Sequence, residues 1–542
     1  MLAAVLFYSL FFLALFVVPA LVIFVFLAFI DHERRLWRVF GPAITPIAKA
    51  WWERPSVRKL RERYPRALSF FARRLNPHDP WGLPATLATI AAATGIWFFL
   101  GIVQDLIGKD PLTTVDVRLH NSVPLFRSPG LTWFMLAITE SASPPVLWLT
   151  CVGIALVALS RGHQRLAATL VFGVAGSGIV SSVLKAAFGF ARPGDTVIAA
   201  HEATFPSGHM LSGAVVYGVL ASLVLRSDTA ASKRAAATTL LVLFIACIGV
   251  SRLYLGVHWP SDILGSLALA LICLALLLFF LDYDRPLPRI DSFTIPLAPA
   301  SLQRLGVGVI FVAIVIGALL MMRTRIALIA PAAPLRPISQ AALMNGIPAD
   351  IPRRAEGLIG EKMEPFSLVL IGSSNDVIAT FNRGGWTKAD LPTPIRVMKE
   401  SMAVIMNRPD PSGPATPAYL ADRPQTLTFE KPDASSAGIR RRHHTRVWQT
   451  AYCVVPDCRP VWVATASFDV GIELSAPLHL PTHRIDTHID AERALIVSDL
   501  LRAGATELGM IVVVPPLRGT NAAGDPFTTD GRAVILMAAH AR

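Results

Sequence analysis

The chain has 542 residues, of which 53% are apolar and 16% charged, and its formal net charge is +13. This composition, with a mean hydropathy of +0.52, excludes an ordinary soluble protein. The basic residues are divided between short loops and the C-terminal part, without a single patch interleaved with aromatic residues. Nucleic-acid binding is therefore not indicated, and membrane topology together with anionic lipid headgroups explains the excess charge.

Most apolar residues precede residue 325 and fall in segments long enough to cross about 30 Å of hydrocarbon. The first segment has no basic residue before its apolar run and stays apolar for most of residues 1–30, so we expect a retained anchor rather than a cleaved signal peptide. The segments predict about eight spans, near residues 3–30, 85–107, 140–160, 166–188, 210–226, 236–251, 262–282 and 303–322.

The distribution of Lys and Arg predicts the orientation of these spans. Residues 31–84 are rich in Lys and Arg, which places them in the cytoplasm and the N-terminus outside. Counting from there, the basic loops at 161–165 and 226–234 also fall inside. Three polar clusters at the ends of apolar segments then all fall outside, as does the C-terminal part if the last segment crosses. These clusters are Lys185–Pro193, Pro206–His209 and Ser251–Asp262.

The first cluster contains two cations. Lys185 and Arg192 are seven residues apart and share one face if the helix continues to Pro193. Taken alone, such a pair is more often two side chains that reach toward the membrane interface.

The second cluster predicts an anion site at a turn. Pro206 and Gly208 permit a tight turn at which Ser207, the Gly208 amide and His209 can point at one anion. The same four residues in isolation would indicate only a loop.

The third cluster pairs a histidine with a carboxylate. Arg252 ends an apolar segment, and Pro260 is a typical start of the next helix. Asp262 then faces back toward His258, where a carboxylate at one ring nitrogen leaves the other nitrogen free to attack phosphorus. Asp262 could equally serve as a helix cap, and the two roles are compatible.

Together the three clusters resemble the signatures of the phosphatidic acid phosphatase type 2 superfamily, which includes lipid phosphate phosphatases. The resemblance covers residues 85–285 and implies a six-helix phosphatase core within a polytopic, mainly α bundle. It implies that His258 forms a phosphohistidine, that Asp262 orients it and that His209 protonates the leaving oxygen. It also implies that the phosphate is held by Lys185, Arg192, Ser207, the Gly208 amide and Arg252.

The resemblance implies no metal and no cofactor, and the loops contain no carboxylate cluster suited to magnesium. A pocket at the outer leaflet admits an amphiphile, so we expect a lipid phosphate or diphosphate of the phosphatidic acid, phosphatidylglycerol phosphate, undecaprenyl diphosphate or lipid A phosphate class. The expected location is the inner (plasma) membrane of a bacterial-type cell.

Two alternative functions remain. One is phosphate transfer between lipids, and the other is a membrane-anchored protein that binds an envelope glycolipid. A transporter is less favoured because the polar residues gather at one membrane face.

After the last apolar segment the composition changes. Pro-rich residues 330–348 predict a linker, and a soluble α/β or α+β domain is expected from about residue 349. Strands are expected at Phe366–Ile371, Val461–Phe468, Ile511–Val514 and Ala533–Met537, with helices near 389–406 and 490–503. The predicted division is an anchor at 1–30, a basic segment at 31–84, the membrane core at 85–285, a last span with linker at 286–348, and the soluble domain at 349–542.

This domain is similar to the LssY-type C-terminal domain over residues 350–540, a resemblance that implies a fold and little chemistry. It rests on Gly372-Ser373, Gly385-Trp386, Arg442-His443-His444, Arg446, Trp448, Phe468-Asp469-Val470-Gly471 and Asp490-Ala491-Glu492-Arg493. The basic run Arg440–Trp448 could bind a phosphate or headgroup, but we favour a strand with one buried and one solvated face. Its two adjacent histidines would point to opposite faces, which disfavours joint metal binding.

The cysteines fall into two groups. Cys151, Cys247 and Cys273 lie in apolar segments and are expected to be small core residues. Cys453 and Cys458 bracket a turn between strand-like runs, which is compatible with a disulfide in an oxidising compartment or with two free thiols. Zinc binding is the weaker interpretation.

Overall fold

The structure is a computed structural model. It describes residues 46, 50, 53–76, 79–109, 111–194, 196–198, 203–227, 229–282, 300–323, 334–391, 393, 396, 399–400, 402–403, 406–415, 417–433, 441–474, 481–521 and 524–541. Two compact units are present. One contains Ala14–Gly108 and Arg127–Ile329, hereafter the membrane unit, and the other contains Lys109–Phe126 and Ala330–Arg542, hereafter the C-terminal unit. The predicted anchor at 1–30 lies outside the described residues.

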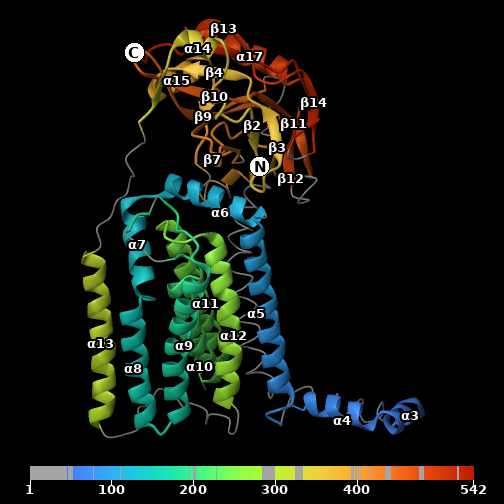
Figure 1. Cartoon of the computed structure of the whole chain (residues 1–542), viewed down its shortest axis with the longest axis vertical. Coiled ribbons are helices and arrows are strands. Elements are labelled where there is room, and N and C mark those ends of the chain that lie inside the picture. The colour runs from blue at the N-terminus through green and yellow to red at the C-terminus, as the bar shows by residue number, and fades with distance from the viewer. Residues whose placement is uncertain are drawn as a thin grey trace. The chain divides into compact units, whose positions relative to one another are not determined.

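The membrane unit is a bundle of helices preceded by two short basic helices (Figure 1). The short pair is α3 (Pro55–Arg63) and α4 (Pro65–Arg74). The bundle consists of α5 (Leu83–Gly108), α7 (Pro129–Glu140), α8 (Pro144–Ser160), α9 (Gln164–Phe188), α10 (Gly208–Arg226), α11 (Ala231–Tyr254), α12 (Pro260–Asp282) and α13 (Ala300–Arg323).

Five helices of the described chain, α5, α9, α10, α11 and α12, are long and apolar enough to cross a membrane. Helices α7 and α8 satisfy the same criterion together but are bent by 49°, so the total is five or six. The bend lies at the break before α8, whose first residue, Pro144, cannot continue a preceding helix. Within α13 only Arg304–Leu320 qualifies, as a shorter apolar helix. The fold is thus the predicted polytopic helical bundle, with five or six long spans among the described residues. Of the eight spans expected, the one at 3–30 lies outside those residues.

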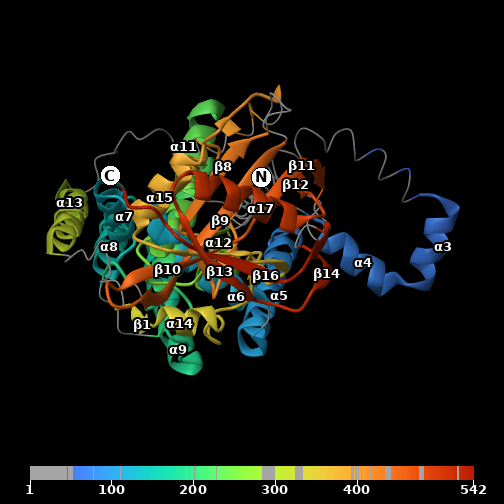
Figure 2. The same ribbon diagram turned by 90° about the horizontal axis from the view of Figure 1, so that it is seen from above.

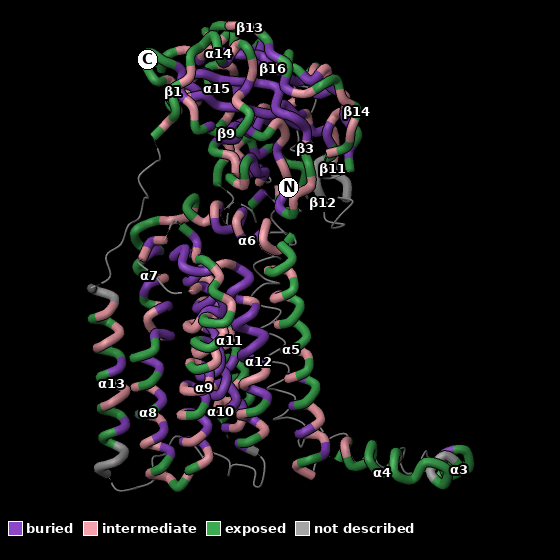
Figure 3. The backbone as a smooth tube through the Cα atoms, viewed as in Figure 1, coloured by how far each residue is buried: buried purple, intermediate pink, exposed green. Residues whose placement is uncertain are grey.

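Helices α10 and α12 form the interior of this bundle (Figure 3). In the apolar spans of α10 and α12, 67% and 61% of the residues, respectively, are buried. In the span of α5, only 17% of the residues are buried. Helix α5 nevertheless approaches α12 closely at Gly95, where an added Cβ would lie 2.7 Å from the backbone oxygen of Ala268. Only glycine permits this approach, because a backbone oxygen cannot move aside cheaply.

The C-terminal unit is built on one large, mostly antiparallel sheet (Figure 2). Its strands run in the order β12 (Pro481–Ile485), β11 (Ser467–Leu474), β9 (Arg442–Val454), β10 (Arg459–Ala464), β4 (Leu368–Ile371), β16 (Arg532–Met537) and β13 (Thr506–Val512). Off this path, β1 (Arg336–Ile338) and β8 (Leu427–Pro432) pair with β9, and β5 (Thr387–Lys388) pairs with β8. The smaller strands are β2 (Arg354–Glu356), β3 (Lys362–Pro365), β6 (Tyr419–Leu420), β7 (Arg423–Pro424), β14 (Leu517–Thr520) and β15 (Pro526–Thr529).

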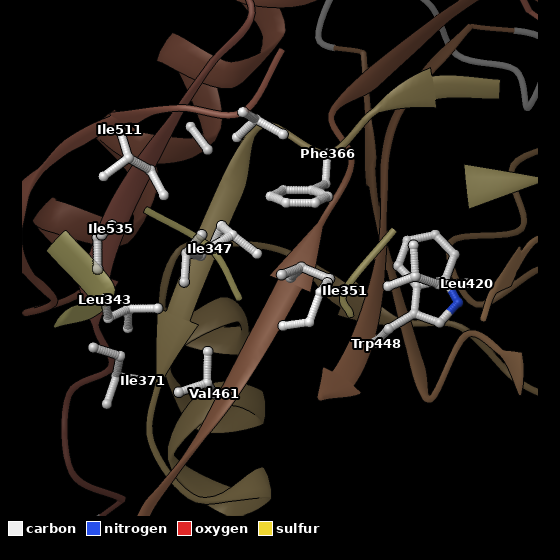
Figure 4. Packing of buried hydrophobic residues seen from close by; sticks show 14 of the residues in the cluster. Leu343, Ile347, Ile351, Phe366, Ile371, Leu420, Trp448, Val461, Ile511 and Ile535 are labelled. Carbon is white, nitrogen blue, oxygen red and sulfur yellow. The ribbon is translucent and has the colours of Figure 1, made fainter. Parts of the chain in front are cut away.

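The central strands β4 and β10 of this sheet are buried on both faces. Alternate residues of β4 illustrate the period of two, since Val369 and Ile371 join one apolar cluster and Leu368 and Leu370 join the other. The first cluster includes Leu343 of α14 (Gln340–Met344) and is shown in Figure 4. The second contains residues of α15 (Ser374–Arg383) and α17 (Ile489–Arg502). A sheet covered on two sides explains why its strands read as nearly continuous apolar runs.

The C-terminal unit differs from the expected element boundaries at its linker and at one strand. The linker prediction is wrong for 336–344, because β1 pairs in parallel with β9 and Leu343 is buried in the core. The single strand expected at 461–468 is two strands, β10 and β11, that pair with β9 along different parts of its length. The helix expected at 490–503 is α17, whereas the stretch 389–406 is described only in part.

One segment from the predicted membrane core belongs to the C-terminal unit. It consists of α6 (Pro111–Ser122) and the 3-10 helix η2 (Val123–Phe126), which follow α5. Arg118 forms ion pairs with Glu356 and with Asp422, the latter at 2.9 Å, and lies over the ring of Tyr419. Val115 and Leu119 pack with Leu358 and Tyr419 in a small apolar cluster.

The close approach of α5 to α12 yields a matched pair of variants. Gly95→Ala places a methyl group against the α12 backbone and is expected to cost about 1–3 kcal/mol. Gly101→Ala on the same helix meets nothing within 4 Å and is expected to be neutral or slightly stabilising. Thermal unfolding of the two full-length variants in detergent measures the difference, and equal melting temperatures would contradict the packing.

Candidate phosphate site

The first motif spans the end of a helix. Helix α9 ends at Phe188, and Gly189 follows in the left-handed conformation with φ 61°. Lys185 therefore lies in the last helical turn, while Arg192 lies in the loop beyond it. The expectation that the two share one continuous helical face is wrong, because Gly189 ends the helix before Arg192 is reached.

The loop returns Arg192 to the third motif. Its Nη1 donates a 2.6 Å hydrogen bond to the carbonyl oxygen of Val257, the residue before His258. Trp259, the residue after His258, donates from Nε1 to the carbonyl oxygen of Ala191 at 2.9 Å. These two bonds join the Lys185–Pro193 loop to the chain on both sides of His258.

The second motif forms the start of α10. Ser207 occupies the N-cap position, but its side chain does not cap the helix. Its Oγ is buried and has no hydrogen-bond partner among the described residues. Gly208 packs closely, since an added Cβ would lie 3.2 Å from Ser181 Oγ. His209 follows in the first turn of α10, so the motif presents a hydroxyl, a free helix-start amide and an imidazole together.

The third motif places the histidine against its carboxylate. His258 lies in the turn between α11 and α12, and its Nδ1 is 3.0 Å from Asp262 Oδ2. The backbone amide of Trp259 donates to the same oxygen at 2.8 Å. His258 and Asp262 are 2% and 1% exposed, so their contact is shielded from water. Because Nδ1 faces the carboxylate, Nε2 is the nitrogen left for other chemistry.

Arg252 brings a buried cation to the same region. It is 5% exposed, and its Nη1 donates to Thr139 Oγ1 of α7 at 2.7 Å. Its Nε is buried without a hydrogen-bond partner in the described structure. Burial, followed by the charges of Arg252, Arg192 and Lys185, lowers the pKa of His258 well below its usual range. The imidazole is therefore neutral near pH 7, with a lone pair available on Nε2.

Thr204 is a contributor that the sequence motifs did not reveal. Its hydroxyl donates to Asp262 Oδ2 and lies 3.2 Å from His258 Nδ1, and its side chain is fully buried. It precedes the Pro206–His209 motif by two residues and carries no pattern of its own. Thr139 was missed for the same reason, because a lone threonine on an apolar helix has many ordinary roles.

In the C-terminal unit, the basic run predicted from sequence lies on β9. The expectation of a solvated face is wrong, because Thr445 and Val447 on one face of β9 are buried as fully as Arg442, His444 and Arg446 on the other. Arg442 forms ion pairs with Glu430 at 2.6 Å, Asp469 at 3.2 Å and Glu400 at 3.3 Å. A strand that is covered on both faces leaves no solvated side for these charges, so they are neutralised by carboxylates from neighbouring segments.

The two histidines of this run point to different partners, as alternation along a strand requires. His443 Nδ1 lies 2.9 Å from Glu492 Oε2, and His444 Nδ1 lies 3.1 Å from Asp469 Oδ1. Within the described part of the chain, no group of three or more His, Cys, Asp or Glu residues could hold a metal ion. Cys453 and Cys458, further along β9 and its turn, form a disulfide.

Two family models match separate parts of the chain. The family model described as the PAP2 superfamily matches residues 166–286, and the one described as the LssY C-terminus matches residues 349–533. Phosphatidylglycerophosphatase B of Bacillus subtilis is 30% identical over 201 residues, which cover 36% of this chain and 95% of that protein. The chain belongs to the PAP2 superfamily.

Two further relatives are lipid A 1-phosphatases. The protein of Rhizobium etli is 28% identical over 22% of this chain and 60% of its own length. The protein of Rhizobium johnstonii is 32% identical over 28% of this chain and 56% of its own length. A crystal structure of a transmembrane PAP2-type phosphatidylglycerolphosphate phosphatase from Bacillus subtilis matches 36% of this chain and 98% of that chain, with 25% identity and a TM-score of 0.33.

The buried carboxylates around Arg442 predict a pH dependence of stability. Burial raises the pKa of Glu400 from 4.5 to about 7, against the opposing charge of Arg442, and burial raises the pKa of Glu430 well above its usual range. A raised carboxyl pKa means that the folded state binds more protons than the unfolded state. The stabilisation is therefore complete below pH 4.5 and is lost as the pH rises through about 7.

We expect the free energy of opening of β8 and β9 to fall by about 2 kcal/mol between pH 5 and 7.5. Hydrogen exchange of the full chain, corrected for the intrinsic pH dependence of exchange, measures this change. Glu400→Gln should reduce the difference, whereas Glu507→Gln, at an exposed position of β13, should leave it intact. A free energy of opening that rises with pH would contradict the raised pKa values of Glu400 and Glu430.

Proposed function

We propose that the protein hydrolyses a lipid phosphate or diphosphate through a phosphohistidine at His258. One observation carries the proposal: a buried imidazole has its Nδ1 3.0 Å from a buried carboxylate. In the same region, a buried arginine Nε and a buried serine hydroxyl have no hydrogen-bond partner among the described residues. A histidine held in this way is an activated nucleophile, and the unsatisfied donors suit an anion.

The first step is attack on phosphorus by His258 Nε2. The new N–P bond forms as the bond from phosphorus to the lipid oxygen breaks, and that oxygen takes a proton from His209. The positive charge on the imidazole is stabilised by Asp262, which Thr204 and the Trp259 amide hold in place through hydrogen bonds to its Oδ2. The two bonds leave that carboxylate little freedom to turn away.

The second step regenerates the histidine. His209 takes a proton from water, the water oxygen attacks phosphorus, and the N–P bond breaks to release inorganic phosphate. Both steps place added negative charge on the non-bridging oxygens. Arg252 Nε and Ser207 Oγ, which are buried without acceptors in the described structure, supply donors for that charge. Lys185, Arg192 and the Gly208 amide complete the set. The mechanism requires no metal ion.

The relatives support a lipid substrate. The names phosphatidylglycerophosphatase and lipid A 1-phosphatase both denote enzymes that act on lipid phosphates. The helices of this chain that bear the motifs are apolar enough to span a membrane. A phosphate site at the ends of such helices lies at headgroup depth, where a lipid phosphate resides. We therefore propose a membrane lipid phosphate rather than a soluble ester.

The side of the membrane follows from chain order. If α7 and α8 cross as one bent span, residues 109–126 and the Lys185 end of α9 face the same side, since two crossings separate them. Residues 109–126 belong to the C-terminal unit, and we propose that this unit lies on that side. The positive-inside rule applied to residues 31–84 makes it the outer, periplasmic side of the inner membrane.

Loss of the nucleophile is the primary prediction. His258→Ala should lower phosphate release from a panel of lipid phosphates and diphosphates by ~10³-fold or more, with EDTA present throughout. His540→Ala, at an exposed histidine of the C-terminal unit, is the matched control and should retain wild-type activity. Full activity of His258→Ala would overturn the mechanism, and loss of wild-type activity in EDTA would overturn its metal independence.

Thr204 is predicted to act as a positioning residue. Thr204→Val removes the hydroxyl that binds Asp262 and should lower kcat about tenfold while KM changes little, because ground-state phosphate contacts remain. Thr204→Ser restores the hydroxyl and should recover most of kcat. Steady-state kinetics of the two variants make the comparison, and a Ser variant as impaired as the Val variant would show that only packing matters.

A further inference from the structure

We propose that the C-terminal unit contains a second lipid site, which binds the phosphorylated, hydroxyl-bearing headgroup of a membrane phospholipid. The site is a cavity of about 610 Å³ between η2 and the β5–β8 edge, hereafter the η2 cavity. Its walls include Leu125, Phe126, Lys388, Asp390, Leu391 and Arg396. All these residues belong to the C-terminal unit, and the proposal goes beyond the hydrolysis at His258.

The size of the η2 cavity suits a headgroup with the first part of its chains. Ligand sites for small molecules commonly enclose about 300–1,000 Å³, and the η2 cavity falls in the middle of that range. Its walls are not those of a packing defect, because they combine charged side chains, hydroxyls and exposed apolar groups.

Two cations of the η2 cavity supply the attraction for phosphate. Lys388 is exposed on β5 and takes part in no ion pair among the described residues. Arg396 is held by Asp390 at 2.7 Å and Asp410 at 3.1 Å, yet its buried Nη1 has no hydrogen-bond partner among the residues described. A phosphate oxygen would satisfy that donor and pair with Lys388.

The remaining polar residues of the cavity favour a headgroup with hydroxyls. The carboxylate of Asp390 would repel a bare, doubly charged phosphate but accepts a hydrogen bond from a hydroxyl. Thr393, Gln425 and Thr428 add neutral hydrogen-bonding groups. A phosphodiester that carries glycerol or sugar hydroxyls matches this combination of one acceptor, two cations and neutral groups.

The apolar residues of the cavity favour a lipid over a free phosphate ester. Leu125 and Leu391 are large side chains that are 36% and 47% exposed, and Phe126 and Leu427 lie beside them in the cavity wall. A soluble ester would leave this surface in water, whereas an acyl chain would cover it.

Only a short stretch of chain joins the cavity wall to α7 of the membrane unit. Only Arg127 and Ser128 separate Phe126 from α7, so the wall lies within ~10 Å of that helix's first residue. Arg127 Nε and the Ser128 amide donate to the carbonyl and hydroxyl oxygens of Tyr254, respectively, at the end of the helix that bears Arg252. The chain thus joins one wall of the η2 cavity directly to a helix of the membrane unit.

The test uses the full chain purified in dodecyl maltoside, a detergent without phosphate. It carries His258→Ala so that no turnover occurs. Phosphatidylglycerol with a photoactivatable diazirine near the top of one acyl chain is the probe, and labelled peptides are mapped by mass spectrometry. Labelling is expected on the peptides that contain 125–126 and 388–391. The corresponding diacylglycerol probe, which lacks the phosphate, should label them at least ~fivefold less.

Lys388→Glu should lower labelling of these peptides about fivefold, with labelling in α9–α12 unchanged. Lys362→Glu, at an exposed lysine of β3 outside the cavity, is the matched control and should label like the parent. Equal labelling by the neutral probe, or labelling unaffected by Lys388→Glu, would overturn the site. If free glycerol phosphate displaced the probe at the same concentration as phosphatidylglycerol does, the assignment of the η2 cavity to a lipid would be overturned. None of these outcomes depends on whether His258 is the nucleophile.

Discussion

The contact between His258 and Asp262 is the constraint on which the membrane unit depends. A carboxylate and an imidazole that are both almost fully buried require partners, and the chain supplies them with Thr204 and the amide of Trp259. Those partners come from two separate segments, so the loop after α9 and the turn before α12 must meet. The hydrogen bonds from Arg192 to Val257 and from Trp259 to Ala191 hold these two segments together.

This arrangement leaves its cations incompletely satisfied. Arg252 reaches Thr139 with one nitrogen, whereas its Nε and the buried Oγ of Ser207 have no hydrogen-bond partner in the part of the chain that the structure describes. Buried donors without acceptors cost stability, which is characteristic of sites prepared for an anion. The C-terminal unit differs, because Arg442 is surrounded by Glu400, Glu430 and Asp469. Its charges satisfy one another, which is typical of a structural network.

The sequence predicted the membrane bundle and the three motifs because both signals are local. A long apolar run requires no knowledge of its neighbours, and a Pro or Gly ends a helix wherever it stands. Thr204 and Thr139 could not be predicted, since their roles arise from contacts with segments distant in sequence. The same limit applies to Arg118, whose partners Glu356 and Asp422 lie more than two hundred residues away, at separations of 238 and 304. Alternation on β9 was predictable, but the cover on its second face was not.

The most direct test of the central claim is to trap the covalent intermediate. The wild-type chain is mixed with a lipid substrate carrying ³²P in its phosphate, quenched in alkali, where phosphohistidine survives, and digested for mass spectrometry. The account predicts acid-labile phosphate on the peptide that contains His258, and none when that residue is alanine. Phosphate release at the normal rate with no label on His258, or with label on another residue, would contradict it.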